Sequence, residues 1–222
     1  PESSSEVLTK SMVSITDVIS EGVTSVDLRV NAKEQAPYKT GFTPATKVGA
    51  EAAKKRLLVW GRYSEGEANL ERITLPFDEA GDGRNITISG DFEYFLFRDE
   101  QEKERVLSEL GRVGFSLNSA QAYYKNRDDV SVVAVTGGDL LVDFQQNKFS
   151  TELNMHHLDL GEAVFRAGGV LRDGGYFSSY ASGGKSSLAG AVSLDGQEAG
   201  YFFDFLNWQG AIQGITLWNA GK

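Results

Sequence analysis

The chain has 222 residues and a formal net charge of −9, from 31 acidic and 22 basic side chains. Such an acidic chain repels phosphate backbones, so its charge weighs against nucleic acid as a partner. It has no cysteine, which excludes disulfides and thiolate metal sites, and no apolar run approaches the roughly 18 to 20 residues of a membrane helix. We therefore expect a soluble protein without a transmembrane helix.

The first 55 residues predict an N-terminal extension. Three apolar residues alternate with other side chains and predict a strand: Val26, Leu28 and Val30. An earlier segment, 12–19, fits a second strand, although part of it also fits one helical turn. The segment Lys47–Lys55 is rich in alanine, but it is so short that a helix there would depend on packing. We expect this strand-rich extension to pack on one side of the rest of the chain.

The pattern of a barrel begins at Arg56, and the first strand is predicted at Leu57–Arg62. A later strand, Ile86–Arg98, carries apolar side chains on both of its faces. A strand of a small barrel needs only one dry face, so the second apolar face implies cover by another element. The N-terminal extension is the candidate for that cover.

The segment Asp99–Leu110 predicts the one short helix of the chain. Its first half is charged, its last apolar residues recur at helical spacing, and Gly111 ends it. The strand Val113–Tyr124 follows, and a further short strand is predicted at Val130–Val135. Between these two strands lies a cluster of aromatic and cationic residues.

The last third of the chain consists of short strands joined by tight turns. Turn signatures occur at Gln146-Asn147, Asp173-Gly174 and Asp195-Gly196. The strands around them are Leu140–Gln145, Phe149–Met155, Gly161–Arg172, Gly175–Tyr180, Ser186–Leu194, Glu198–Asn207 and Ala211–Trp218. Such a series either leaves exposed edges or curls until its last strand meets its first. We predict closure, and hence an all-β protein in which residues 56–222 form an eight-stranded antiparallel up-and-down barrel.

Three strings in this region carry a resemblance to a known family: Phe165–Phe177, Leu188–Phe203 and Gly214–Trp218. They resemble a C-terminal barrel of bacterial envelope proteins, which occurs on some FecR-like sensor chains and is similar to the barrels of transferrin-binding protein B. Matching strands upstream extend the resemblance to residues 57–218. It implies a non-enzymatic binding or interaction module at the bacterial cell surface or in the periplasm. It also implies secretion as part of a longer precursor.

No motif predicts catalysis, a cofactor or a metal. His156 and His157 are the two histidines, and neighbours on a strand point to opposite faces, so they cannot readily chelate one ion together. The acidic segment Asp78–Arg84 lacks the ligand spacing of a calcium loop, so we interpret it as a solvated turn. The string Gly183–Ser186 lies between strands rather than ahead of a helix, so it is not a phosphate loop. Neither a Gly-x-Ser-x-Gly elbow nor a distinctive carboxylate pair is present.

The predicted binding residues are Tyr123, Tyr124, Lys125 and Arg127, since aromatic anchors beside cations contribute much of the affinity at interfaces. In a competing interpretation, the two tyrosines end a strand with their rings packed on the barrel rim. We expect a protein partner or a small ligand at the cell envelope. The alternatives are a lipocalin-like carrier of a small apolar ligand, a barrel module of a FecR-like signalling protein, and an enzyme such as a hydrolase.

Overall fold

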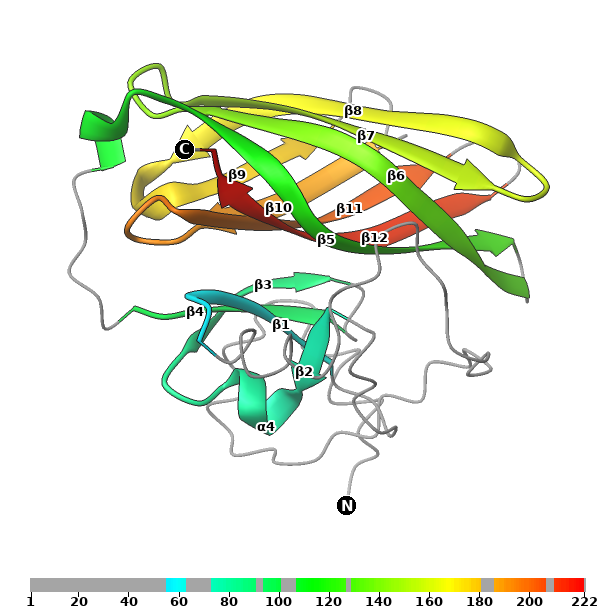
Figure 1. Ribbon diagram of the computed structural model, residues 1–222, viewed down its shortest axis with the longest axis horizontal. Helices are drawn as coiled ribbons and strands as arrows, with labels where there is room; N and C mark the ends of the chain where they lie inside the picture. Colours follow the sequence, from blue (N-terminus) through cyan, green and yellow to red (C-terminus); the bar gives the residue numbers. More distant parts are fainter. Residues whose placement is uncertain are drawn as a thin grey trace.

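The computed structural model describes residues 55–62, 73–90, 94–100, 107–126, 129–180, 186–206 and 210–221. The strands and the helix predicted before residue 55 lie outside these residues, and so does most of the predicted N-terminal extension. Within the described part, none of the helices is long and apolar enough to cross a membrane. Two assemblies of strands account for this part of the chain (Figure 1).

The larger assembly is a closed antiparallel barrel of eight strands, as predicted. Each strand pairs with the next along the chain, and β12 pairs with β5 to close the ring. The strands are β5 (Arg112–Asn126), β6 (Asp129–Asp143), β7 (Lys148–His157), β8 (Gly161–Arg172), β9 (Tyr176–Tyr180), β10 (Ser186–Val192), β11 (Glu198–Leu206) and β12 (Ala211–Ala220). The predicted up-and-down topology is therefore confirmed. The two strands predicted at Val130–Val135 and Leu140–Gln145 are, however, one strand, β6, with a register shift between Val135 and Gly137.

The predicted turn residues adopt the backbone angles that their chemistry allows. Asn147, Gly174 and Gly196 have φ angles of 53°, 79° and 74°. These values lie in the left-handed region, which glycine and asparagine tolerate better than other residues. A short 3-10 turn, η2 (Asp173–Gly175), forms the connection that contains Gly174. The three sequence signatures therefore set the places where the chain reverses.

The interior of the barrel is filled by large side chains. The rings of Tyr201 and Trp218 stack with their centroids 5.7 Å apart, and Phe165 lies 5.0 Å from Phe203. All four are buried in one core cluster. The Tyr201 hydroxyl lies 2.9 Å from the Thr151 hydroxyl, and burial raises the pKa of this tyrosine. Alternate residues along the barrel strands point inward and thus build a packed core.

The smaller assembly corrects part of the sequence prediction. The strands predicted in the barrel at Leu57–Arg62 and Ile86–Arg98 belong instead to a separate four-stranded sheet in the order β2-β1-β4-β3. The second of them is two antiparallel strands rather than one. Its elements are β1 (Leu58–Arg62), β2 (Thr74–Pro76), α4 (Phe77–Ala80), β3 (Asn85–Gly90) and β4 (Tyr94–Arg98). Period-two alternation indicates a strand but does not indicate which sheet the strand joins. The first strand of the barrel is therefore known only from the structure, and it begins at Arg112.

Two further segments differ from their predictions. The segment predicted as a solvated turn at Asp78–Arg84 begins within α4, a single helical turn, because the Phe77 carbonyl accepts the Gly81 amide at 3.0 Å. Of the predicted helix Asp99–Leu110, the described end is the 3-10 helix η1 (Leu107–Leu110), and residues 101–106 lie outside the described part.

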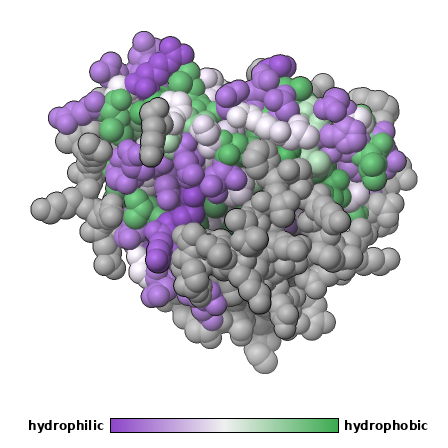
Figure 2. Space-filling model, viewed as in Figure 1, coloured by the Kyte–Doolittle hydropathy of each residue, from purple (hydrophilic) through white to green (hydrophobic). Residues whose placement is uncertain are grey.

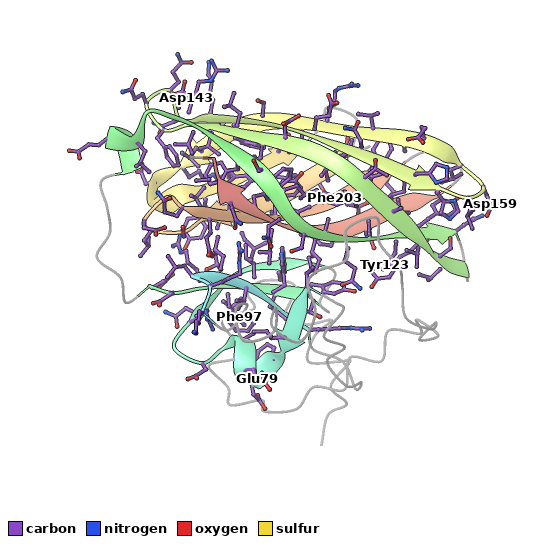
Figure 3. The ribbon with its side chains drawn as sticks, in the orientation of Figure 1. Glu79, Phe97, Tyr123, Asp143, Asp159 and Phe203 are labelled. Atoms are coloured by element: carbon purple, nitrogen blue, oxygen red, sulfur yellow. The ribbon has the colours of Figure 1, made fainter. Side chains whose placement is uncertain are left out.

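Both faces of the small sheet are covered, as the apolar pattern of β4 predicted. One face places Trp60 and Leu96 in a cluster with Ile215 and Leu217 on the outer wall of the barrel. On the opposite face, five buried residues pack together with Phe77 of α4: Val59, Leu75, Ala80, Phe95 and Phe97. Among the described residues, the barrel wall therefore supplies the cover that the sequence assigned to the N-terminal extension. Figure 3 shows Phe97 in the small sheet and Phe203 within the barrel.

Polar contacts fasten the small sheet to the wall. The indole nitrogen of Trp60 donates to the Thr216 carbonyl at 3.0 Å. The buried Arg98 guanidinium donates to the carbonyls of Gly174 and Val192, and it lies 4.4 Å from the centre of the Tyr176 ring. Arg98 thereby holds the turn between β8 and β9 to the small sheet.

An ion pair also joins the two assemblies at the same end of the barrel. Glu198 lies 3.6 Å from the Arg56 Nε atom, and it accepts the Leu58 amide at 2.9 Å. Burial raises the pKa of the Glu198 carboxyl, although the Arg56 charge opposes that shift. Burial likewise lowers the pKa of Arg56. Burial of this ion pair therefore costs desolvation free energy, and removal of either partner would leave the other charge buried and unpaired.

Replacement of Gly196 by valine tests the turn between β10 and β11. We expect a loss of about 1 to 2 kcal/mol in the free energy of unfolding, because a β-branched residue is strained at positive φ. Urea denaturation measures this loss. Gly137→Ala is the matched control, since a Cβ atom at Gly137 meets nothing within 4 Å. An unchanged midpoint for Gly196→Val would contradict the turn.

Replacement of Glu198 by alanine tests the docking of the small sheet. We expect a loss of about 2 to 3 kcal/mol in the free energy of unfolding, because Arg56 and the Leu58 amide both lose a buried partner. The control is Glu152→Ala, which breaks the exposed Arg166–Glu152 pair at 2.7 Å and should cost less than about 1 kcal/mol. Equal losses in the two variants would show that the Arg56–Glu198 contact does not stabilise the docking.

Candidate functional site

The two ends of the barrel are built differently. At the end that we call the turn end, three short connections join β6 to β7, β8 to β9 and β10 to β11. Side chains stabilise them: Asp143 accepts the Gln146 amide at 2.8 Å, and Asp195 accepts the Gln197 amide at 2.9 Å. The small sheet contacts this end through Arg56 and Arg98.

At the opposite end, which we call the loop end, four connections join β5 to β6, β7 to β8, β9 to β10 and β11 to β12. The structure describes one of them in full, the segment 158–160 between β7 and β8. Figure 3 shows Asp143 and Asp159 at opposite ends of the barrel. Because the strands run up and down in turn, the strand ends that flank these four connections lie at one rim of the barrel.

The predicted binding residues lie at the loop end of β5. Tyr123 and Tyr124 are both buried, each 7% exposed, but on opposite faces of the strand. Tyr123 belongs to the cluster between barrel and small sheet, whereas Tyr124 belongs to the barrel interior. Lys125 is half-buried, and Arg127 lies outside the described residues. A role in binding for this group stays a prediction, and the structure does not bring the two tyrosines together on one surface.

His157 is a residue of the loop end whose structural part the sequence did not reveal. It is 3% exposed, and its ring lies 5.0 Å from that of Tyr124. Its Nδ1 atom accepts the backbone amides of Asp159 and Leu160 at 3.2 and 3.3 Å. His157 therefore holds the turn between β7 and β8, while the adjacent His156 is half-buried and on the other face of the strand.

The hydrogen bonds of His157 also bear on its chemistry. Its Nε2 atom lies 2.7 Å from the Ser131 hydroxyl. Because Nδ1 accepts two amides, the proton of the neutral ring belongs on Nε2, which then donates to Ser131. An Nε2 atom that donates cannot take the serine proton, so this pair is not arranged as a nucleophile and its base. Within the described part of the chain, no three His, Cys, Asp or Glu side chains gather as a metal site would need.

Outward-facing residues of β11, β12 and β5 form a second feature of the loop end. We call Tyr123, Asp204, Leu206 and Gln213 the outer-wall patch. Asp204 lies between two inward phenylalanines along β11 and therefore points outward. It pairs across the strands with Gln213, which in turn pairs with Tyr123. Gln213 donates to the Asp204 carboxylate at 3.1 Å.

Sequence reasoning missed Asp204 and Gln213 as possible site residues. The available signal was their polarity on a wall whose neighbouring outward positions, Phe202 and Ile215, are apolar. That signal becomes visible only once the strand register is known, because residues nine positions apart in the sequence lie side by side.

Exposed apolar side chains occur at the same end. Leu158, at the tip between β7 and β8, is 92% exposed, and Leu206 at the end of β11 is 44% exposed. Elsewhere on the barrel, Val170 on the outer face of β8 is 60% exposed. On the face seen in Figure 2, hydrophilic and hydrophobic residues are interspersed over the described surface.

Comparison with known proteins found no matching family and no matching curated protein. Among solved structures, the chain is similar to intact TbpB with its N and C lobes, at 14% identity and a TM-score of 0.40. That match covers 57% of this chain and 29% of the TbpB chain, so this chain spans less than a third of that protein.

Two lipocalin structures are also similar. The siderocalin Ex-FABP matches at 7% identity and a TM-score of 0.27, over 53% of this chain and 75% of its own. The lipocalin Q83 matches at 7% identity and a TM-score of 0.30, over 54% and 73% of the two chains. None of these TM-scores reaches 0.5, so the likenesses establish neither a shared ligand nor a shared function.

Replacement of His157 by alanine tests its hold on the turn between β7 and β8. We expect a loss of about 2 to 3 kcal/mol in the free energy of unfolding, because two amides lose their acceptor and a cavity forms. Hydrogen exchange at Asp159 and Leu160 should accelerate beyond what the global loss explains. The matched control is His156→Ala, which should leave both amides unchanged. Equal exchange in the two variants would contradict this role of His157.

Proposed function

We propose that this chain is a non-enzymatic binding module of the bacterial cell envelope, which recognises a protein partner at the loop end of its barrel. The observation that carries the proposal is the pair of exposed apolar side chains at the loop end, Leu158 and Leu206. The small sheet is fastened to the barrel by polar contacts at the turn end, which leaves these two side chains free of it. A rigid scaffold that presents adjacent loops is the usual arrangement of a recognition surface.

The packed interior supports recognition on the outside of the barrel. A carrier of a small apolar ligand needs space between the strands, as in barrels that hold one ligand. Here Tyr201, Phe203 and Trp218 fill the middle of the barrel. The exposed Leu158 and Leu206 offer a partner apolar contact at the loop end. A protein partner therefore fits this geometry better than a lipocalin-like ligand does.

The cellular location in this proposal rests on the sequence resemblance. The strings around Phe165–Phe177 and Leu188–Phe203 resemble envelope barrels of the transferrin-binding protein B and FecR-associated kinds. We accordingly propose that the module acts in the periplasm or at the outer-membrane surface, as part of a longer secreted precursor. A FecR-like signalling chain is one setting for such a module.

The test begins with capture of a partner. The full chain is immobilised and incubated with envelope extract from native cells, and the bound proteins are identified by mass spectrometry. Hydrogen exchange of the complex then maps the contact surface. We expect protection of the connection 158–160 and of the loop-end residues of β5 and β11, with no change at the turns around Gly174 and Gly196.

Variants locate the contact independently. Leu158→Ser with Leu206→Ser should weaken binding at least tenfold, because both side chains are exposed and available to a partner. Val170→Ser, an equally conservative change on the outer face of β8, should leave binding unchanged. All three substitutions are at exposed positions, so the thermal midpoints should stay within a few degrees. Protection at the turn end, or recovery of an apolar small molecule by solvent extraction, would refute the proposal, and the second result would favour the carrier.

A further inference from the structure

One stretch of the barrel wall has a neighbouring strand on only one of its two sides. β8 pairs with β7 over residues 161–170 without a break, but it pairs with β9 only over residues 170–172. In that register Tyr180, the last residue of β9, comes level with Gly168. Among the described residues, the stretch 161–167 therefore has a strand on the β7 side alone.

The backbone groups of this stretch alternate in direction. The Ser179 hydroxyl of β9 donates to the Gly168 carbonyl at 2.9 Å, so that carbonyl points away from β7. Residues two apart bond to the same side of an antiparallel strand, so Glu162, Val164 and Arg166 also direct their amide and carbonyl groups away from β7. Because β9 does not extend along this stretch, these groups have no strand to pair with in the described part of the chain.

The same stretch is open to solvent. Val164 is 39% exposed, and the Arg166 side chain is 68% exposed. Ala163 and Ala167 face the barrel interior and are nevertheless half-buried, whereas the inward Leu153 of β7 is fully buried. An approaching strand can therefore reach the edge of β8 at these positions.

Free amide and carbonyl groups at every second residue match the edge of another strand. The outward side chains indicate which strand this edge fits. Glu162 and Arg166 carry opposite charges and lie equally far along the strand from Val164. In an antiparallel pair centred on Val164, each Glu162 is opposite the Arg166 of the other copy, and the two valines are opposite each other. A centre at Glu162 or at Arg166 would place like charges opposite each other, so the charges favour the register centred on Val164.

We propose that residues 162–166 of β8 pair with the same residues of a second copy of this chain, in antiparallel order about a two-fold axis. The walls of the two barrels then join in one continuous sheet. Arg166 already contacts Glu152 of its own β7 at 2.7 Å. Its guanidinium has several N–H donors, so it can also bond to Glu162 of the second copy. The pairing goes beyond the proposed function and does not depend on it, because it uses a strand edge rather than the exposed leucines.

Self-association of the full chain tests the pairing. In sedimentation equilibrium between about 10 μM and about 1 mM protein, we expect the mass to rise toward that of a dimer with a Kd on the order of 100 μM, because a short strand pair buries little area. Hydrogen exchange should slow with rising concentration at the amides of Glu162, Val164 and Arg166. The amides of Ala163 and Phe165 face β7 and should not change. A chain that stays monomeric over this range would overturn the inference.

Charge variants assign the dimer to this edge. Glu162→Arg alone and Arg166→Glu alone should each weaken self-association at least tenfold, because each places like charges opposite each other twice. An equimolar mixture of the two variants should form a heterodimer at least as tightly as the parent chain, because opposite charges then meet at both contacts. Arg172→Glu is the matched control, since it reverses an exposed charge of β8 outside the paired stretch and should leave the dimer unchanged. Single variants that dimerise like the parent chain, or a mixture that stays monomeric, would refute the pairing.

Discussion

Closure of the sheet by β12 against β5 is the constraint on which the rest of this structure depends. It joins the first and last barrel strands and removes the exposed edges that an open series of eight strands would leave. A closed ring of this size has an interior just wide enough for side chains, and the stack of Tyr201 on Trp218 occupies it. The inward and outward identity of every barrel residue follows from that closure.

The outer wall of β10, β11 and β12 then becomes a platform for the small sheet. Trp60 and Leu96 pack on Ile215 and Leu217, and the polar contacts of Arg98 and Glu198 gather at the turn end. The same end already has hydrogen-bonded turns, so the two effects reinforce each other. The small sheet consequently lies below the barrel in the view of Figure 1, against the wall that carries β12.

Because large side chains fill the barrel interior, the features that a partner could contact lie on the outside of the barrel. His157 shows that the loop end is itself partly organised, because a buried ring holds the turn between β7 and β8 through two backbone amides.

The sequence by itself determined seven of the eight barrel strands, their up-and-down order and the turns at Gly174 and Gly196, because these depend on local alternation and local backbone freedom. It divided β6 into two strands, because Gly137 and Gly138 interrupt the alternation. It could not assign Leu58–Arg62 to a separate sheet, since alternation is the same whichever strand becomes the neighbour. It named Tyr123 and Tyr124 together, although their opposite directions on β5 place one on the wall and the other in the core. The meeting of Asp204 and Gln213 was decided only by the tertiary structure, because cross-strand register brings together residues that no spacing in the sequence connects.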